Sequence, residues 1–480
     1  MEKALSIPEI RMHIGRFLST RDLKSCAVLS RAWAESLTPW LWWSVTVRSK
    51  DNPGFIETVS KHAGHVRSLC LGGHNLSKKQ YVQFQALKFI KFTNDPTNPS
   101  FEDNIIALIK RNRPTLGYLR AGNCRGMKTE TLRAILDSPS LKSLSLVNLA
   151  LREKELAEEL LQTFTRMTRL DIVKLNPSGW SMLCTPTQVF CHLTSLRITV
   201  LEHPDHLGFL KACPNLRRLI TNLKNTITRN EFTRALLASC PKLHALYYCH
   251  DLDSTIGDMN RLIQGLPPMK YLQVKNLKSS YYVTTPNMFS RHFATLQVVR
   301  FDFLYICSGQ KLLTILTSCP NLRYISGGSL RSQDIDPLTP WVCLGLEYFD
   351  SRILWHPEEQ AMLPTLWMQL SRLTRLCYLT IGSMAQSSPT SNITSFGLDE
   401  GLKLLEPLKQ LAHFETLGPS LEWHEKEVEW VIQSWPCLCS IHGEIQQDEE
   451  ERKDLWKRLN YAGIYLRNHP DDISDYINSL

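Results

Sequence analysis

Apolar residues recur along this 480-residue chain in one short pattern. Strings such as Leu141-Lys-Ser-Leu-Ser-Leu and Leu193-Thr-Ser-Leu-Arg-Ile place apolar side chains at their first, fourth and sixth positions. Between Val66 and Leu438 the pattern occurs about fifteen times, at an average interval of about 27 residues. Because alternate side chains of a strand point to opposite faces, each string predicts a short strand with one buried face.

A second apolar pattern, with spacings of three and four residues, precedes several of these strings and predicts helices. It covers the ranges 104–110, 130–137, 231–238 and 311–317. Several helices would end before a Cys-Pro pair, at Cys213, Cys240 and Cys319, because proline lacks the amide hydrogen that continues a helix. Strands and helices alternating at this period are typical of leucine-rich repeats. We therefore expect an α/β repeat solenoid with a parallel sheet on its concave face and helices on its convex face, although the Asn that usually follows the strand is mostly missing.

The first forty residues follow a helical pattern of their own. Ile10, Ile14 and Leu18 lie on one face of a predicted helix that has Pro8 in its first turn and Ser6 as its cap. A turn at 19–22 then leads into a second apolar series that runs from 23 to 33. A unit this small cannot hold a core unaided, so it either docks on another protein or merely caps a larger domain.

The residues of this segment favour docking, because the segment resembles an F-box. That motif has a Leu-Pro near its start, a Phe-Leu about ten residues later, an Asp-Leu, an Arg-x-Trp and a closing Leu-Trp. The chain matches it in register, with Ile in place of the first Leu, at Ile7-Pro8-Glu9, Ile14, Phe17-Leu18, Asp22-Leu23, Cys26, Leu29-Ser30-Arg31-Ala32-Trp33, Pro39 and Leu41-Trp42.

The resemblance implies binding to the Skp-type adaptor of cullin-RING ubiquitin ligases, and through it to the cullin. Part of the matched residues would contact the adaptor, and part would hold the helices together. Carried over by position, the candidate adaptor-binding residues are Ile7, Pro8, Ile10, Ile14, Phe17, Leu18, Leu23, Trp33, Leu41 and Trp42.

These patterns divide the chain into four parts. Residues 1–45 form the F-box, 46–64 a linker or first strand, and 65–445 a solenoid of about fifteen degenerate repeats. Residues 446–480 form a helical cap, with Trp456, Leu459, Ile464 and Tyr465 expected to point inward, because the end of an open solenoid needs covering.

The strand positions that alternate with the leucines predict a recognition surface. In each string the third, fifth and seventh residues would project from the concave face. Tyrosine and arginine are common there, and both are common anchors of binding surfaces, although tyrosine also suits any strand through packing alone. The candidate target-binding residues are Phe89, Lys91, Tyr118, Arg120, Arg197, Arg218, Tyr271, Lys275, Arg300, Tyr324, Tyr348, Arg352 and Tyr378.

The net charge indicates what such a surface would bind. The chain carries +9 at pH 7, and its last 35 residues are acidic, so the remainder is more basic still. This balance favours an acidic or phosphorylated protein target. Nucleic acid fits less well, because the cations are spread at the repeat interval and the sequence contains no known reader motif.

Motifs for chemistry are missing from the sequence. It has no glycine-rich phosphate loop with its lysine, no Gly-x-Ser-x-Gly elbow, no His-Glu-x-x-His helix and no Cys-x-x-Cys pair. Fourteen cysteines in a chain of this length indicate reduced, structural thiols rather than disulfides. We expect no catalytic residue, no metal and no cofactor.

The sequence therefore predicts the non-catalytic substrate-recognition subunit of an SCF-type ubiquitin ligase, acting in the cytoplasm or nucleus. No stretch is apolar enough to span a membrane, and no secretion signal is apparent. The alternative is a leucine-rich-repeat scaffold with no part in ubiquitin transfer. The sequence does not identify the target, because recognition surfaces vary freely on one architecture.

Overall fold

The computed structural model describes residues 2–48, 51, 53–72, 83–94, 99–183, 188–224, 227–250, 256–275, 288–301, 309–331, 334–354, 363–382, 397–398, 401–417, 423–443 and 449–466. The chain divides into two compact units. Unit 1 comprises Met1–Thr221 with Ala238–Lys242, and unit 2 comprises Asn222–Leu237 with Leu243–Leu480.

Unit 1 begins with four short helices: α1 Glu2–Leu5, α2 Pro8–Gly15, α3 Thr20–Ala27 and α4 Arg31–Leu41. The Ser19 hydroxyl accepts a hydrogen bond from the Asp22 amide, and the Ser30 hydroxyl accepts one from the Trp33 amide, so each serine caps the helix that follows it. The apolar series from 23 to 33 is therefore broken into two helices. The predicted Ser6 cap is wrong, because α2 begins after Ile7 and no side chain caps it.

Close packing joins α2 to α4. A Cβ atom on Gly15 would lie 2.6 Å from Cδ2 of Leu37 and 2.7 Å from Cδ1 of Trp40, so only glycine allows the two helices this approach. The buried Arg11 guanidinium donates from Nε to Oγ of Ser36 at 3.0 Å and from Nη1 to the carbonyl of Leu5 at 2.8 Å. These contacts hold α1, α2 and α4 together.

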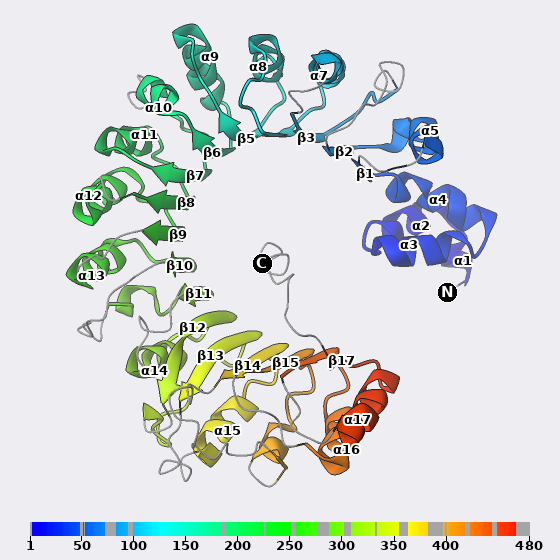
Figure 1. The fold of residues 1–480 in the computed structure, drawn as a ribbon, viewed down its shortest axis with the longest axis vertical. Coiled ribbons are helices and arrows are strands. Elements are labelled where there is room, and N and C mark those ends of the chain that lie inside the picture. The colour runs from blue at the N-terminus through cyan, green and yellow to red at the C-terminus, as the bar shows by residue number, and fades with distance from the viewer. Residues whose placement is uncertain are drawn as a thin grey trace. The chain divides into compact units, whose positions relative to one another are not determined.

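Strand and helix then alternate through the repeats of unit 1 (Figure 1). The elements are β1 Ser44–Arg48, α5 Pro53–Lys61, η1 Ala63–His65, β2 Ser68–Gly72, β3 Phe89–Thr93, α7 Pro99–Asn112, β4 Tyr118–Gly122, α8 Thr129–Leu136, β5 Ser143–Leu149, α9 Lys154–Phe164, β6 Arg169–Leu175, α10 Pro177–Leu183, β7 Ser195–Leu201, η2 Pro204–Leu207 and α11 Gly208–Lys211. Each strand from β1 to β7 pairs in parallel with the next one in the chain. Around the boundary between the units the chain forms β8 Arg218–Leu223 and α12 Arg229–Ser239.

Unit 2 continues the same alternation. Its elements are β9 Ala245–His250, α13 Ile256–Gly265, β10 Tyr271–Lys275, η3 Ser290–His292, β11 Val298–Phe301, α14 Gly309–Ser318, β12 Tyr324–Arg331, β13 Tyr348–Leu354, α15 Leu363–Ser371, β14 Tyr378–Gly382, η7 Leu402–Leu405, β15 His413–Leu417, α16 Glu425–Ser434, β16 Ser440–His442, α17 Glu449–Tyr461 and β17 Tyr465–Leu466. From β9 to β17 consecutive strands again pair in parallel.

This arrangement is that of an α/β leucine-rich-repeat solenoid, as the sequence predicts. In each unit taken by itself the helices lie on one side of the strands (Figure 1). The fourth positions of the strings, such as Leu144, are buried, and so are most sixth positions, such as Leu146. The four helices predicted from spacing are present as α7, α8, α12 and α14, and α12 and α14 end directly before Cys240-Pro241 and Cys319-Pro320.

A backbone feature repeats at the end of three successive strings. Asn123, Asn148 and Lys174 occupy the same repeat position, and all three have left-handed backbone, with φ of 52°, 59° and 60°. Asparagine tolerates this conformation better than most residues, which explains why it is usual here. The repeats of this chain keep the conformation in β6 although the residue is lysine.

The end of unit 2 is capped only in part as predicted. Leu459 of α17 and Ile464 beside β17 are buried, so they do point inward. Trp456 is 41% exposed and Tyr465 is 60% exposed, so the prediction that they also point inward is wrong. Of the helices described, none combines the length and apolar character needed to cross a bilayer.

Candidate protein-interaction surfaces

An apolar surface is exposed on the N-terminal helices of unit 1. Phe17 is 73% exposed after α2, and Val28 and Leu29 are 83% and 69% exposed between α3 and α4. Ile7 and Ile10 at the start of α2 are also exposed. We call these five residues the N-terminal apolar surface. Five exposed large apolar side chains are many for so small a module, and exposed apolar area is typical of partner-binding sites.

The other predicted adaptor-binding residues have different environments. Pro8 is exposed, whereas Leu23 is buried and belongs to the internal core of the helices. Ile14, Leu18, Trp33 and Leu41 are half-buried, and each keeps part of its side chain accessible. The Trp42 ring stacks on His62 with centroids 4.5 Å apart, so it joins the helices to the first repeat.

Sequence reasoning missed Val28 and Leu29. The second apolar series, from 23 to 33, is interpreted as one segment in which neither residue is expected to be exposed. Their signal in the sequence is Ser30, which begins a new helix and leaves the two residues before it in a connecting turn.

The strands of unit 1 present polar and aromatic side chains between the buried leucines. We call the side chains at the third and fifth positions of the repeat strings the strand face of each unit; the third position is the first residue of strands such as β3 and β4. In β3 and β4 the register pairs Phe89 with Tyr118 and Lys91 with Arg120. Tyr118 is 51% exposed, and Lys91 and Arg120 are exposed as well, whereas Phe89 is half-buried. These four predicted residues are therefore brought together on one surface.

Farther along the same face a cation has an acidic neighbour. Asp171 of β6 is buried, accepts a hydrogen bond from Oγ of Ser145 at 3.0 Å, and lies 3.7 Å from Nε of Arg197. The charge of Arg197 is thus balanced within unit 1. Arg218 of β8 is half-buried.

The strand face of unit 2 differs from the prediction. Tyr324, Tyr348 and Tyr378 occupy the third position of their repeat strings, and they lie side by side on the adjacent strands β12, β13 and β14. Their rings stack with centroids 4.2 Å and 4.1 Å apart. Their exposed fractions are 1%, 3% and 7%, and Tyr271 is half-buried against the same group. The expectation that these tyrosines are exposed is wrong for all three stacked rings. We call them the tyrosine column.

A polar row lies beside the tyrosine column, at the fifth position. Ser326 donates a hydrogen bond to Oδ2 of Asp350 at 2.7 Å, and both Tyr378 and Thr380 donate from their hydroxyl groups to Oε2 of Glu415. Burial raises the pKa of the Asp350 carboxyl, and the nearby Glu415 raises it further, against the opposing effects of the Ser326 hydroxyl, Arg300 and Thr380. Burial likewise raises the pKa of the Tyr378 phenol, with the hydrogen bond to Glu415 acting in the same direction.

The unit 2 strand face is therefore an internal hydrogen-bonded layer, with Arg300 half-buried beside it. The remaining predicted residues, Lys275 and Arg352, belong to β10 and β13, but their side chains lie outside the described part of the structure.

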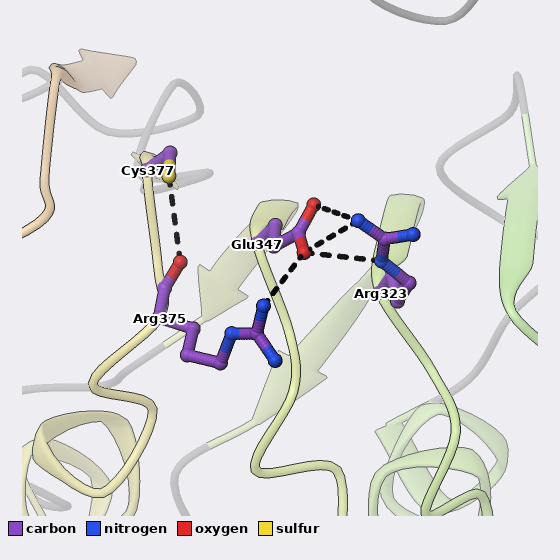
Figure 2. A network of polar contacts seen from close by, with 4 residues as sticks. All are labelled: Arg323, Glu347, Arg375 and Cys377. Carbon is purple, nitrogen blue, oxygen red and sulfur yellow. Dashed lines mark hydrogen bonds and ion pairs between the residues drawn. The ribbon is translucent and has the colours of Figure 1, made fainter. Parts of the chain in front are cut away.

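A carboxylate between two guanidinium groups links three repeats of unit 2 (Figure 2). Glu347 accepts hydrogen bonds from Nε and Nη2 of Arg323 at 3.0 Å and 2.7 Å, and Nη2 of Arg375 lies 3.8 Å from the same oxygen. Cys377 donates from Sγ to the Arg375 carbonyl at 3.4 Å. Arg323, Glu347 and Cys377 directly precede the three tyrosines in the sequence, so the network links the same three repeats as the tyrosine column.

The cysteines are structural where they recur. Cys213, Cys240 and Cys319 are buried at one repeat position, and burial raises the pKa of the Cys240 and Cys319 thiols to about 12. They are thus protonated and unreactive at neutral pH. Within the described residues no three His, Cys, Asp or Glu side chains lie close enough to hold a metal ion.

Comparisons with known proteins found distant structural likenesses and no match by sequence. No protein-family model matches the chain, and no curated protein matches it. Among solved structures, the Rad7 and Elc1 complex in yeast matches with a TM-score of 0.43 and 14% identity, over 98% of this chain and 94% of that one. The leucine-rich repeat-containing protein LegL7 from Legionella pneumophila matches with a TM-score of 0.35 and 14% identity, over 58% of this chain and 89% of that one. At these TM-scores and this identity, neither likeness carries a conclusion about this chain.

Proposed function

We propose that this protein is the substrate-recognition subunit of a cullin-RING ubiquitin ligase, in which the N-terminal helices bind a Skp-type adaptor and the repeats bind a protein target. The observation that carries the proposal is the N-terminal apolar surface, exposed on a helical module whose sequence resembles an F-box. Burying Phe17, Val28 and Leu29 against a partner removes apolar area from water, which is the main driving force of protein association.

The mechanism is proximity rather than chemistry by this chain. The adaptor connects the N-terminal helices to the cullin, while a target held on the repeats has its lysines kept near the charged conjugating enzyme. Holding both ends converts a bimolecular encounter into one with a high effective concentration. No catalytic residue, metal or cofactor of this chain takes part.

The test introduces charge into the N-terminal apolar surface. Phe17→Asp combined with Leu29→Asp should weaken adaptor binding by at least about 30-fold, because each side chain would place a carboxylate in an apolar interface. Both residues are largely exposed, so the repeats should remain folded, and circular dichroism checks this. Co-purification with the Skp-type adaptor is the measurement, with Ile14→Asp and Leu18→Asp as a second pair.

The matched control is Tyr461→Asp, which changes an apolar residue that is 95% exposed at the other end of the chain. It should bind the adaptor normally. Full adaptor binding by the double variant would contradict the proposal. If the adaptor binds but no cullin is recovered with it, the alternative is favoured, in which the repeats form an interaction scaffold with no part in ubiquitin transfer.

A further inference from the structure

Two cations lie side by side on the unit 1 strand face. Lys91 of β3 and Arg120 of β4 are register partners, and neighbouring strands are only about 4.8 Å apart. Both side chains are exposed. Within the described residues, neither side chain makes a hydrogen bond or has an acidic partner. Like charges directly opposite each other disfavour the sheet, so this pair costs stability unless an anion lies between them.

Another cation at the fifth string position, Arg197, has an acidic partner within the protein. The buried Asp171 lies two strands beyond Arg120, in β6, and Nε of Arg197 in β7 is 3.7 Å from its carboxylate. On the helix side, Arg113 pairs with Asp137 and Lys128 with Asp103. Lys91 and Arg120 have no such carboxylate in the described structure, although Asp171 shows that the row can accommodate one.

Aromatic rings lie directly beside the two cations. Phe89 and Tyr118 are also register partners, two residues earlier on the same face, and Tyr118 is 51% exposed. Lys88 lies next to them, with Nζ 5.8 Å from the centroid of Trp43. A ligand that joins an anionic group to an apolar group could therefore contact the cations and the rings together. A phosphorylated side chain within a peptide is such a ligand.

We propose that Lys91 and Arg120 form a phosphate-binding site that recognises a phosphorylated segment of the target, with Phe89 and Tyr118 contacting the residues next to the phosphate. One phosphate carries nearly two negative charges and matches two cations, and arginine can donate to it through two N–H groups. The proposal rests on the proposed function in taking the occupant to be the target.

A nucleic-acid strand is the poorer fit. The row that contains the two cations continues through Ser145 to Asp171 in one direction and to Cys70 and Thr46 in the other. A strand with one phosphate per nucleotide would meet a carboxylate on one side and neutral residues on the other, whereas a single phosphate needs only the pair.

The experiment measures fluorescence anisotropy of the full chain with three probes. They are a peptide pool with a fixed central phosphoserine and randomised flanks, the same pool without the phosphate, and a single-stranded RNA of twelve nucleotides. We expect the phosphorylated pool to bind at least about tenfold more tightly than either other probe, and its binding to weaken as salt rises.

The decisive variant is Arg120→Glu, which would pair with Lys91 instead of repelling it. We expect it to abolish phosphopeptide binding while leaving the melting temperature unchanged or higher, so loss of binding cannot come from unfolding. Lys91→Ala should weaken binding about tenfold or more. Arg111→Ala removes an exposed cation on α7 of the same repeat and should leave binding unchanged.

The proposal is overturned if the phosphorylated pool binds no better than the unphosphorylated pool, if the RNA binds more tightly, or if Arg120→Glu keeps full binding. A lower melting temperature for Arg120→Glu would also overturn it, because Arg120 would then be a structural residue. Adaptor binding is measured in parallel on the same variants. These residues lie outside α1–α4, so failure of this site and failure of the proposed function give different results.

Discussion

Tyr118 in unit 1 and Tyr348 in unit 2 occupy the same position of the repeat, yet the first is 51% exposed and the second 3%. Tyr118 is flanked on the sheet by Phe89 and Ser143, whereas Tyr348 lies between Tyr324 and Tyr378. A ring stacked on both sides loses both of its faces to its neighbours, while a ring beside a serine keeps one open. The repeat position therefore decides the direction of a side chain, and the side chains on the adjacent strands help decide whether it stays exposed.

The charges on the two strand faces differ in the same way. Unit 1 exposes Lys91 and Arg120, whereas unit 2 carries Asp350 and Glu415 in hydrogen bonds with hydroxyl groups of the same layer. The described part of this layer in unit 2 is therefore acidic and hydrogen-bonded around Asp350 and Glu415, unlike the basic surface that the sequence predicts along the whole solenoid. In unit 2 the described side chains of this face stabilise the repeats.

The largest expected effect separates the two tyrosine environments. Tyr348→Ala should destabilise unit 2 by about 3–5 kcal/mol, because it leaves a cavity between two stacked rings. Tyr118→Ala should change the free energy of unfolding by about 0.5 kcal/mol or less, since its ring is half exposed. Hydrogen exchange of the β12, β13 and β14 amides, compared with those of β3 and β4, measures each unit separately. Similar losses for both variants would remove the distinction between the faces.

A smaller change in the free energy of unfolding is expected when Glu415 or Asp171 is replaced. Glu415→Ala should cost about 1–3 kcal/mol, because the buried hydroxyl of Tyr378 and that of Thr380 lose their acceptor. Asp171→Ala should cost about 1 kcal/mol or less, because its partners Ser145 and Arg197 are half-buried and can turn to water. Urea unfolding measures both changes. Glu415→Gln, which keeps an acceptor oxygen, serves as the control and should lose less than Glu415→Ala.

The smallest expected change in stability is that of an Asp350 variant, and it depends on pH. The folded-state pKa of Asp350 is raised above its ordinary value of 3.8, mainly by burial, so ionisation of this carboxyl destabilises the fold as pH rises through the folded pKa. Asp350→Asn cannot ionise, and its amide oxygen can still accept from Ser326. The variant should be more stable than the natural chain at neutral pH, with a difference that shrinks as the pH falls toward 3.8. Thermal melting at several pH values checks this.

The groups that face Asp350 could also make Asp350→Asn less stable than the natural chain at neutral pH. Glu415 acts with burial, whereas Arg300, Ser326 and Thr380 favour the ionised form. If Asp350→Asn is less stable than the natural chain at neutral pH, attraction to Arg300 outweighs burial. The unit 2 strand face would then contain a functioning ion pair, more like Arg197 and Asp171 of unit 1.

Local sequence information was sufficient for the repeat architecture. Leucine spacing predicts the strands, three- and four-residue spacing predicts α7, α8, α12 and α14, and proline marks where α12 and α14 end, because each signal acts within a few residues of the chain. The N-terminal helices were also predicted, but not the break before Ser30 that exposes Val28 and Leu29. A capping hydroxyl competes with helix continuation over one turn, and the apolar pattern alone does not show which of the two prevails.

The sequence by itself determined that this chain is a stack of strand-and-helix repeats, and which residues alternate with the leucines. Only the tertiary structure decided which of those residues are accessible, since paired residues that are about 21 to 35 positions apart in sequence become neighbours about 4.8 Å apart in the sheet. Tyr324, Tyr348 and Tyr378 are ordinary strand residues taken singly, and they become a buried column only through parallel pairing in register. The same pairing sets Lys91 against Arg120 and leaves that pair exposed.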